Sequence, residues 1–576
     1  MGNLSQQKRL RMLEFLNKIK EDYKDDDKIL ASLGEIENEI NSKKYGLIWE
    51  KHEEQVDAMM RNHIPVFTEV NEKEINATSE NSFNFLLEGD NLHSLKLLEK
   101  THLGRIDVIY IDPPYNTGNK DFIYNDNLID NNDNFFHSKW LSFMFERLII
   151  ARRLLSEDGV IFINIDENEA HQLKLLLDEV FFEFNLVGEF IWKARSGKSG
   201  TNSLVATSHE YVYCYSKNKN RVNFFSELKI NNKDKKEALR QWGQNVFRED
   251  RPTMFFPIFY KDTVFCLPEY EEYRNIYTSN KEFDDAYLKL LIKKYENKGY
   301  ICVLPEINGR YGRWRKSFDG VKELIKNNLL ILDQDNHSKF IIKKLIPSGK
   351  MTSTAVDSLL SDVDTASHGT LEMKKIFKGK KVFSTTKPIK LVKTLINYSV
   401  HNKLNACVLD FFAGSGTTGH AVMQLNKEDG GNRRFILCTN NENNICEEVT
   451  YKRIKNVING YDDVPGIPAN LKYYKTKFVN KYHEELSDEL MKHIQEMVQL
   501  EQGIKIDNQK YMLILSDEDA DELERNWHKD NQLKALYVSQ DVLFTASQNK
   551  LFSNVEIHVI PDYYFGLELK EAGESW

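Results

Sequence analysis

The chain has 576 residues, of which 41% are apolar and 29% charged, and its formal net charge is −9. This length predicts about two to four domains, and the composition is that of a soluble globular protein. The chain holds no apolar run of about 18 residues, and its N-terminus lacks the layout of a secretion signal, so no membrane span is expected. The six cysteines form no C-x-x-C pair and no cluster with histidine, which favours reduced thiols in a cytoplasmic protein without a metal site.

Periodicity along the chain predicts alternating helices and strands. Residues 1 to 70 are expected to form a helical extension, because apolar residues recur there at helical spacing. Short apolar runs bounded by turn residues predict buried strands at 84–90, 105–112 and 159–166, with helices between them. Further strands are expected at these positions: 182–194, 210–217, 406–412, 433–439, and in YMLILS and VEIHVI near the C-terminus.

An irregular, aromatic-rich and basic stretch interrupts this alternation between 226 and 370. Strand–helix units on both sides of an insert are typical of one sheet whose chain leaves to build a second domain. We therefore predict a doubly wound, mostly parallel α/β sheet formed by 71–225 and 371–465, with an inserted domain at 226–370. Residues 466–576 are predicted to form a C-terminal α/β domain.

The charge is unevenly spread. Residues 191–350 hold 30 Lys+Arg and 19 Asp+Glu, a net charge of +11, whereas residues 481–576 hold 9 and 20, a net charge of −11. A basic middle region can follow a phosphate backbone, which would repel the acidic C-terminal region. Chance variation between solvated faces is the alternative.

The stretch VLDFFAGSGTTGHAV, residues 408–422, has the pattern of a strand, a tight turn and a helix start. Gly414 and Gly416 allow the backbone to turn and approach a ligand at the helix N-terminus. With Gly419 they fit G-x-G-x-x-G, so a dinucleotide and a purely structural turn both remain alternatives. Glu442 follows the next strand, where an acid commonly holds a ribose diol. Together these features predict a nucleoside-bearing cofactor.

A second motif, IDVIYIDPPYNTGN at 106–119, ends an apolar strand on an aspartate and two prolines. Asp90, Asp112 and Asp410 each lie near the end of a predicted strand, so they are expected to meet at one crevice. The prolines lack N–H groups, so the loop presents only acceptors: the Asp112 carboxylate and neighbouring carbonyls. Tyr115 offers a flat face on which a planar base can stack.

These groups suit a substrate that bears an NH₂ group. An exocyclic amine is a poor nucleophile because its lone pair is delocalised into the ring. Hydrogen bonds from both N–H groups to fixed acceptors free that lone pair, and a carboxylate stabilises the developing positive charge. A base inside a duplex would have to be flipped out to reach the site. The alternative interpretation is a rigid turn at the end of a strand.

The pairing of DPPY at 112–115 with F-x-G-x-G at 412–416 resembles the amino-methyltransferases that modify adenine N6 or cytosine N4 in DNA using S-adenosyl-L-methionine. The catalytic motif precedes the glycine motif, with the insert between them, which is similar to the β-type order. The aspartate of DPPY implies adenine N6, because cytosine-N4 enzymes usually carry serine there and protein-glutamine methyltransferases usually carry asparagine.

The likeness continues beyond these motifs over roughly residues 40–480. Five stretches look like the modification (Mod) subunits of type III restriction–modification systems: KYGLIWEKHEE, LLEGDNLHSLKLL, DPPYNTGNKDFIYND, HSKWLSFMFERL and TNNENNICEEVTYKRI. The resemblance implies a site-specific, nucleoid-associated bacterial DNA methyltransferase that acts as a homodimer on double-stranded DNA. A restriction (Res) helicase–nuclease partner is a further implication, although the chain is shorter than many full Mod subunits.

The resemblance also implies roles for individual residues. Asp112, Pro113, Pro114 and Tyr115 would hold and activate the target adenine. The glycine turn would cradle the methionine end of the cofactor, Lys387 and Pro388 would close over its carboxylate, Glu442 would bind its ribose and Asp90 would lie near its adenine. The full set of expected cofactor residues is Asp90, Lys387, Pro388, Asp410, Phe412, Ala413, Gly414, Ser415, Gly416, Thr417 and Glu442.

The insert would then be a target-recognition domain, because it is rich in residue types that read bases and clamp phosphates. Tyr211 would lie near the flipped base, with a packed strand aromatic as the alternative. The expected contacts to the target base or DNA are Tyr211, Arg248, Arg251, Arg310, Arg313, Trp314 and Arg315. Two other functions stay open: a DNA-binding specificity subunit that recruits a nuclease, and an RNA or protein methyltransferase.

Overall fold

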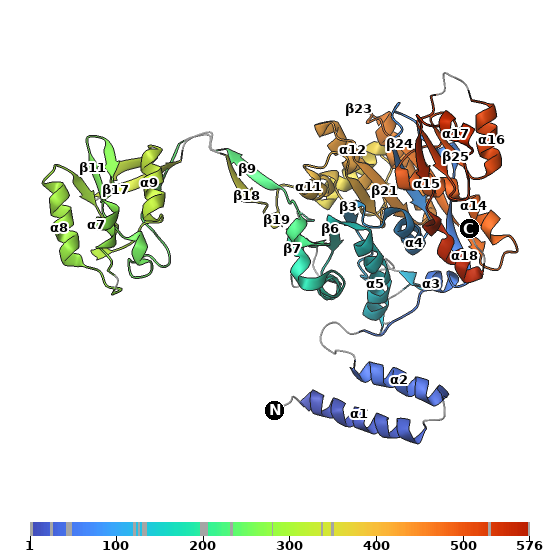
Figure 1. Cartoon of the computed structure of the whole chain (residues 1–576), viewed down its shortest axis with the longest axis horizontal. Coiled ribbons are helices and arrows are strands. Elements are labelled where there is room, and N and C mark those ends of the chain that lie inside the picture. Colours follow the sequence, from blue (N-terminus) through green and yellow to red (C-terminus); the bar gives the residue numbers. More distant parts are fainter. Residues whose placement is uncertain are drawn as a thin grey trace. The chain divides into compact units, whose positions relative to one another are not determined.

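The structure is a computed structural model, and the account below concerns these residues: 4–23, 27–41, 49–118, 123–124, 127–128, 135–195, 205–230, 234–278, 280–335, 338–346, 351–527 and 532–573. The chain divides into two compact units (Figure 1). Met1–Phe225 and Asp357–Trp576 form the first unit, and Ser226–Val356 forms the second. Residues 357–370, predicted as part of the insert, therefore belong to the first unit.

The first unit is built on a ten-stranded sheet in the order β1-β24-β2-β21-β20-β3-β6-β8-β7-β19. Its strands are β1 His63–Glu69, β24 Asn470–Asn480, β2 Phe83–Glu88, β21 Arg434–Thr439, β20 Cys407–Asp410, β3 Ile106–Ile111, β6 Leu155–Ile165, β8 Glu210–Ser216, β7 Leu186–Trp192 and β19 Leu359–Leu360. All neighbours from β24 to β6 are parallel, and β8 is antiparallel to both β6 and β7. The predicted mostly parallel α/β fold is confirmed.

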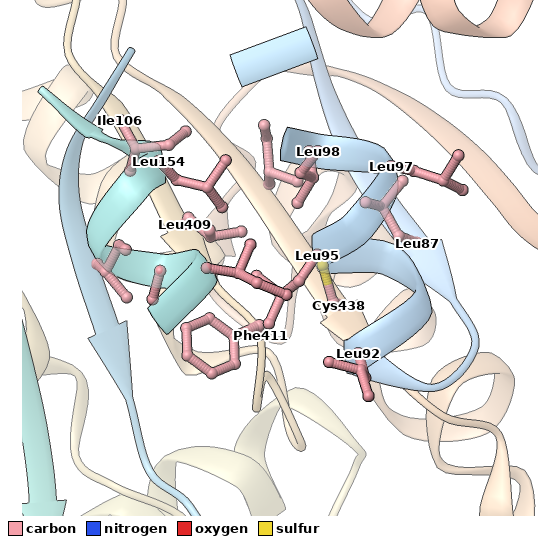
Figure 2. Close-up of a cluster of buried hydrophobic side chains, with 14 of the residues drawn as sticks. Leu87, Leu92, Leu95, Leu97, Leu98, Ile106, Leu154, Leu409, Phe411 and Cys438 are labelled. Atoms are coloured by element: carbon pink, nitrogen blue, oxygen red, sulfur yellow. The ribbon is translucent and has the colours of Figure 1, made fainter. Parts of the chain in front are cut away.

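Helices connect the parallel strands as the sequence pattern predicts. They are α4 Asn91–His102, α5 Phe136–Leu154, α6 Ala170–Leu177, α11 Ile389–Val400, α12 Thr417–Asp429 and α13 Lys452–Asn459. Strands β2 and β20 are buried along their whole length, as is typical of the central strands of a parallel sheet. Figure 2 shows Leu92, Leu95 and Leu98 of α4 in the same buried cluster as Leu409 and Phe411. This core holds the ends of β3 and β20 in place.

Strand order reverses between β20 and β3. From β20 the chain continues to β21 on one side, and from β3 it continues to β6 on the other side. Ligands of doubly wound sheets bind outside the carboxyl ends of the strands at this switch point. The loops that follow β3 and β20 are the two that carry the predicted motifs.

One edge of the sheet differs from the prediction. β1 lies inside the stretch expected to be helical, which otherwise forms α1 Leu4–Asp22 and α2 Asp27–Asn41. β24 lies inside the predicted separate C-terminal domain, yet it pairs with β2 in parallel and with β1 in antiparallel orientation. The partners are about four hundred residues apart, so no local pattern indicates their pairing.

The rest of the C-terminal region carries a small parallel sheet. Its strands are β25 Tyr511–Ile514, β26 Ala535–Val538 and β27 Glu556–Val559, and α16 Asp517–Arg525 and α17 Ala546–Leu551 lie between them in sequence. The sequence pattern predicted the first and third strands but not β26. Among the described residues of the whole chain, no helix has the length and apolar character needed to cross a bilayer.

The second unit has its own aromatic-rich core, which includes Phe255, Phe256 and Trp314. It contains two three-stranded antiparallel sheets, β10-β17-β16 and β12-β11-β13. The elements are β10 Lys235–Ala238, β11 Ile258–Lys261, β12 Val264–Cys266, α8 Asp285–Glu296, β13 Ile301–Val303, β14 Glu306–Ile307, β15 Arg310–Tyr311, α9 Phe318–Lys326, β16 Leu330–Gln334 and β17 Phe340–Ile346.

Candidate active site

Asp112 and Asp410 emerge side by side at the switch point. β3 and β20 are paired through Val108–Val408 and Ile109–Leu409, and each aspartate stands at the carboxyl end of its strand. Burial raises the pKa of Asp410 to about 7, and the nearby charge of Asp112 acts in the same direction. The predicted meeting of these two acids at one edge of the sheet therefore occurs.

A network of four side chains is built around the Asp112 carboxylate. Lys387 Nζ donates to Oδ1 and Oδ2 of Asp112 at 2.9 and 2.8 Å, and Tyr115 OH donates to Oδ1 at 2.8 Å. Tyr115 OH also lies 2.9 Å from Glu210 Oε2, and Lys387 Nζ lies 3.4 Å from the same oxygen. A phenol has one proton to give, so Tyr115 can donate to only one carboxylate at a time.

Lys387 supplies the ammonium group for the two carboxylates of this network. Its side chain is buried, which by itself would lower its pKa, but the charges of Asp112 and Glu210 raise the pKa of the ammonium instead. With one lysine and two acids, the network has a surplus of acidic groups. Such a site favours a ligand that carries or develops positive charge.

The two prolines of the motif present unequal carbonyls. Pro114 O accepts a hydrogen bond of 2.7 Å from the indole Nε1 of Trp140, in α5. Among the described residues, none donates a hydrogen bond to Pro113 O. The acceptors left for an incoming amine are therefore the Asp112 carboxylate and Pro113 O.

The glycine turn after β20 has the predicted form. Gly414 and Gly416 have φ values of 46° and 76°, in the left-handed region, and Gly416 directly precedes the first residue of α12. A Cβ atom on Gly416 would lie 3.2 Å from Thr450 Cγ2, so the turn also packs tightly on its outer side. These glycines leave the N–H groups at the start of α12 directed beyond the end of the strand.

Gly419 has a different task from the other two glycines. A Cβ atom there would lie 2.8 Å from Ile454 Cδ1 and 3.1 Å from Leu437 Cδ1. The third glycine therefore allows α12 to pack closely against α13 and β21. The turn requires the first two glycines and helix packing requires the third, so the G-x-G-x-x-G spacing by itself does not identify a dinucleotide-binding site.

Asp410 holds the glycine turn to the helix that follows. Its Oδ1 accepts from Phe412 N at 3.0 Å, and its Oδ2 accepts from the hydroxyl of Thr418. Ala413 N donates to Cys438 O in β21 at 3.1 Å. Phe412 is half-buried, with its ring centroid 5.8 Å from that of Phe143 in α5. The structure thus gives Asp410 and Ala413 a part in shaping the turn.

Arg453 is a functional candidate that the sequence reasoning missed. It lies fully buried in α13, and its Nη1 donates to Thr417 Oγ1 at 2.8 Å and to Ser415 Oγ at 3.2 Å. Burial lowers the pKa of this guanidinium to about 10, so it stays charged at neutral pH. The sequence feature that could have indicated Arg453 is its position on the apolar face of an amphipathic helix, where an arginine is unusual.

The remaining predicted cofactor residues lie around the same edge of the sheet. Asp90 begins α4 and accepts from Leu92 N at 2.7 Å, and Glu442 is exposed in a short turn after β21. Pro388 directly precedes α11, and Lys387 O accepts from Thr417 Oγ1 at 3.4 Å. Lys387 therefore touches the glycine turn with its backbone while its ammonium group binds Asp112. A contact between Lys387 and a cofactor carboxylate stays a prediction.

On β8 the residue that reaches the Asp112 network is Glu210, the neighbour of Tyr211, which was predicted to lie near the flipped base. Successive residues of a strand point to opposite faces, so only one of the two can join the network. The ring of Tyr211 stacks on that of Tyr213, with centroids 6.4 Å apart, and packs against the main core. A role for Tyr211 at the flipped base remains untested, and the packed-aromatic alternative fits these contacts.

In the second unit, three of the predicted DNA contacts are held by other parts of the unit. Arg248 makes a bidentate ion pair with Asp285 at 2.5 and 2.8 Å. Arg313 is 7% exposed and donates from Nε to Asn245 O at 2.6 Å, and Trp314 is buried with its Nε1 bonded to Phe256 O at 2.8 Å. These side chains are engaged in holding the unit together.

The other predicted contacts lie on the surface. Arg251, Arg310 and Arg315 are exposed; the guanidinium of Arg310 lies 4.0 Å from the ring centroid of Phe247, and Arg315 lies beside Glu237. Trp242, which lies in the same unit but is not among the predicted contacts, is 68% exposed. Gln241 Nε2 donates to Trp242 O at 2.9 Å, and Gln241 N donates to Arg313 O at 2.9 Å. Hydrogen bonds within the second unit therefore fix the backbone of the loop that carries Trp242.

Comparisons with known proteins bear on the whole site. A family model described as DNA methylase, of the N6/N4 class, matches residues 106–452. The chain is 32% identical over 411 residues to the Mod subunit of the type III restriction–modification enzyme StyLTI of Salmonella typhimurium, covering 66% of this chain and 56% of that subunit. The chain thus spans just over half the length of that relative.

A second relative is the type II methyltransferase M.KpnI of Klebsiella pneumoniae, which is 33% identical over 383 residues, or 63% of this chain and 82% of M.KpnI. A solved structure of the complex of M1.HpyAVI with S-adenosyl-L-methionine aligns with 64% of this chain and 97% of that one, at 14% identity and a TM-score of 0.27. The family match, which includes both motifs and the insert between them, shows that the chain belongs to the N6/N4 DNA methylases, whose methyl donor is S-adenosyl-L-methionine.

Proposed function

We propose that the protein transfers the methyl group to N6 of adenine within a specific sequence of double-stranded DNA, after that adenine has been flipped out of the duplex. One observation carries the proposal: two acceptors, the Asp112 carboxylate and the Pro113 carbonyl, lie at the end of β3 with the ring of Tyr115 next to them. Among the described residues, none donates a hydrogen bond to the Pro113 carbonyl. A carboxylate accepts about four hydrogen bonds, and three donor contacts reach Asp112, so one position remains for an amine.

The two acceptors would act on the amine as the methyl group approaches. One N–H group donates to Asp112 and the other to Pro113 O, which draws the nitrogen lone pair out of conjugation with the ring. Positive charge that develops on N6 is stabilised by Asp112. The surplus proton of the methylated nitrogen lies in the hydrogen bond to Asp112, from which it passes to water.

The residues around the glycine turn fit the methyl donor. When bound, S-adenosyl-L-methionine supplies an electrophilic methyl group on a positively charged sulfur. The surplus of carboxylates around Lys387 suits that charge, and the N–H groups at the start of α12 suit the carboxylate of the methionine part. Glu442, exposed after β21, is available for the ribose hydroxyls.

Recognition of the DNA sequence is proposed for the second unit. It carries 24 Lys+Arg and 18 Asp+Glu, a net charge of +6, which favours a phosphate backbone. Trp242, Arg251, Arg310 and Arg315 are the surface candidates for contacts to bases and phosphates. A homodimer and a helicase–nuclease partner are proposals that rest on the likeness to Mod subunits.

The test is to incubate the protein with labelled S-adenosyl-L-methionine and duplex DNA, and then to separate the nucleosides. Label in N6-methyladenine supports the proposal, and label in N4-methylcytosine would replace the proposed base. An absence of label from all DNA would sink it. The alternative of a specificity subunit that recruits a nuclease is favoured by the net charge of −11 over residues 481–576. Co-purification with an ATP-dependent nuclease would support that alternative.

A further inference from the structure

A second group of polar side chains lies directly behind the DPPY loop. Asn116 follows Tyr115 with a left-handed φ of 57° and is almost fully buried. Its Nδ2 donates to Glu169 Oε1 at 2.6 Å and to Phe136 O at 3.3 Å. Glu169, which directly precedes α6, is completely buried. A carboxyl group that contacts the residue next to the catalytic tyrosine is well placed to fix the loop.

The hydrogen bonds of this group are incomplete if Glu169 is ionised. Glu169 Oε1 also lies 2.7 Å from His137 Nδ1, so it accepts twice. Glu169 Oε2 and Asn116 Oδ1 are buried, and among the described residues neither has a hydrogen-bond partner. An unpaired buried acceptor costs about 1–3 kcal/mol, and an unpaired buried charge costs more. The two unpaired oxygens belong to two groups that are already joined by one hydrogen bond.

We propose that Glu169 is protonated in the active enzyme and serves as a positioning residue for the DPPY loop, with its Oε2–H group donating to Asn116 Oδ1. Carboxylic acid and carboxamide then form a pair with two hydrogen bonds, and both unpaired oxygens are satisfied. The inference rests on the proposed function and deepens it, because the loop that Glu169 positions is the one assigned to the target amine.

The surroundings of Glu169 agree with a neutral carboxyl group. Burial raises the pKa of Glu169 to about 8; the hydrogen bond from Asn116 acts in the opposite direction, and the charge of Asp166 adds to the rise. The titratable groups that face Glu169 are His137 and Asp166. Burial lowers the pKa of His137, which disfavours the charged imidazolium that could hold a carboxylate.

Protonation of Glu169 completes a three-point attachment of the loop. Trp140 donates to Pro114 O, Asp112 or Glu210 accepts from the hydroxyl of Tyr115, and Glu169 accepts from Asn116. Loss of the proton would leave Glu169 Oε2 and Asn116 Oδ1 as two acceptors without a donor between them, which would weaken the attachment of Asn116 to Glu169. The loop is then expected to lose its geometry as the pH rises through about 8.

The test compares Glu169→Gln, Glu169→Ala and the matched control Glu167→Gln, an exposed acid two residues away. The amide introduced by Glu169→Gln would keep both hydrogen bonds at every pH, because its NH₂ group can donate to Asn116 Oδ1. We expect kcat of the wild type and of Glu167→Gln to fall about tenfold from pH 7 to pH 9, as the protonated fraction falls. Glu169→Gln should keep its kcat over this range, and Glu169→Ala should lose about tenfold at every pH.

Two measurements separate this inference from the proposed function. The infrared absorption of protonated buried carboxyl groups at pH 7 should be stronger in the wild type than in Glu169→Gln by one carboxyl band, whether or not the protein methylates DNA. Burial raises the folded-state pKa above its ordinary value of 4.5, so the stability due to this group is complete below pH 4.5 and lost as the pH rises towards 8. The melting temperature of the wild type should therefore fall, relative to that of Glu169→Gln, between these pH values.

Other titrating groups are common to both proteins. Burial raises the pKa of Asp410 to about 7 and that of Asp166 to about 6, so only the difference between wild type and Glu169→Gln is informative. Identical carboxyl bands in the wild type and Glu169→Gln at pH 7, or a Glu169→Gln variant as impaired as Glu169→Ala at every pH, would overturn the inference.

Discussion

The loop after β3 and the Trp242 loop of the second unit use hydrogen bonds in opposite ways. In the first loop, partners behind the chain tie down one carbonyl, the tyrosine hydroxyl and Asn116, and a carboxylate and one carbonyl are left to receive a ligand. In the second loop, Gln241 and Arg313 brace the backbone while the tryptophan ring itself projects into solvent. Chemistry at an amine needs fixed acceptors, whereas contact with DNA needs an exposed surface on a fixed support.

The largest effect is expected at Asp112. Replacing Asp112 by Ala should reduce methyl transfer by at least about 10³-fold, because one of two acceptors and the stabilising charge are lost together. Binding of S-adenosyl-L-methionine, measured by calorimetry, should remain. Glu157→Ala, an exposed acid in β6, is the matched control and should transfer methyl groups at the wild-type rate. Loss of the fold in Asp112→Ala would favour a structural turn instead of a catalytic loop.

The next effect concerns the neighbours of Asp112. Lys387→Met should lower kcat about 10²-fold, since it leaves two carboxylates without their ammonium partner. Glu210→Gln keeps an acceptor for Tyr115 and should lower kcat only about tenfold, or about 1.4 kcal/mol. Single-turnover kinetics at saturating DNA checks both values. Equal and small effects of the two variants would contradict the assigned network.

Replacement of Trp242 tests the role proposed for the exposed loop of the second unit. Trp242→Ala should weaken binding of DNA by about 1–3 kcal/mol, with kcat unchanged at saturating DNA, because stacking on a base is lost. Leu290→Ala removes a similarly exposed side chain from α8 and should leave binding unchanged. Fluorescence anisotropy with labelled duplexes measures both. A Trp242→Ala variant that binds DNA as the wild type does would remove this loop from the recognition surface.

The smallest changes distinguish an arginine on the surface from one engaged within the unit. Arg310→Ala should weaken DNA binding several-fold and reduce the salt dependence by about one unit of slope, with no change in melting temperature. Arg248→Ala should instead destabilise the second unit by about 1–3 kcal/mol, because it breaks the ion pair with Asp285 and removes a cation from three aromatic rings. Calorimetry and binding assays on both variants should give opposite results.

The sequence predicted the catalytic loops and the second unit to different extents. The DPPY and glycine motifs were placed correctly because each is continuous, and its spacing already contains the strand end, the turn and the helix start. Glu210 and Arg453 reach the site from distant segments, and only the register of β8 and the packing of α13 decide where they point.

In the second unit, composition was the only guide. Arg248, Arg313 and Trp314 have the residue types of a DNA contact, yet an ion pair, a backbone carbonyl and the core engage them. Composition alone cannot separate an arginine that binds a phosphate from one that binds a neighbouring loop. The edge strand β1 and its neighbour β24 were missed for a similar reason, since each pairs with a strand far away in sequence.

The strand order has a consequence for synthesis of the protein. β2 and β3 are made early, but β21 and β20 lie between them in the sheet and follow some three hundred residues later. At about 5–20 residues per second, the edges of β2 and β3 wait roughly 15–60 s on the ribosome for their neighbours. The second unit is made during this interval and can fold once it has emerged. The strands of the first unit that are already made meanwhile expose unpaired edges, which are prone to aggregation. Because β24 also pairs with β2, a nascent chain of this topology is expected to need chaperones until residue 480 has emerged.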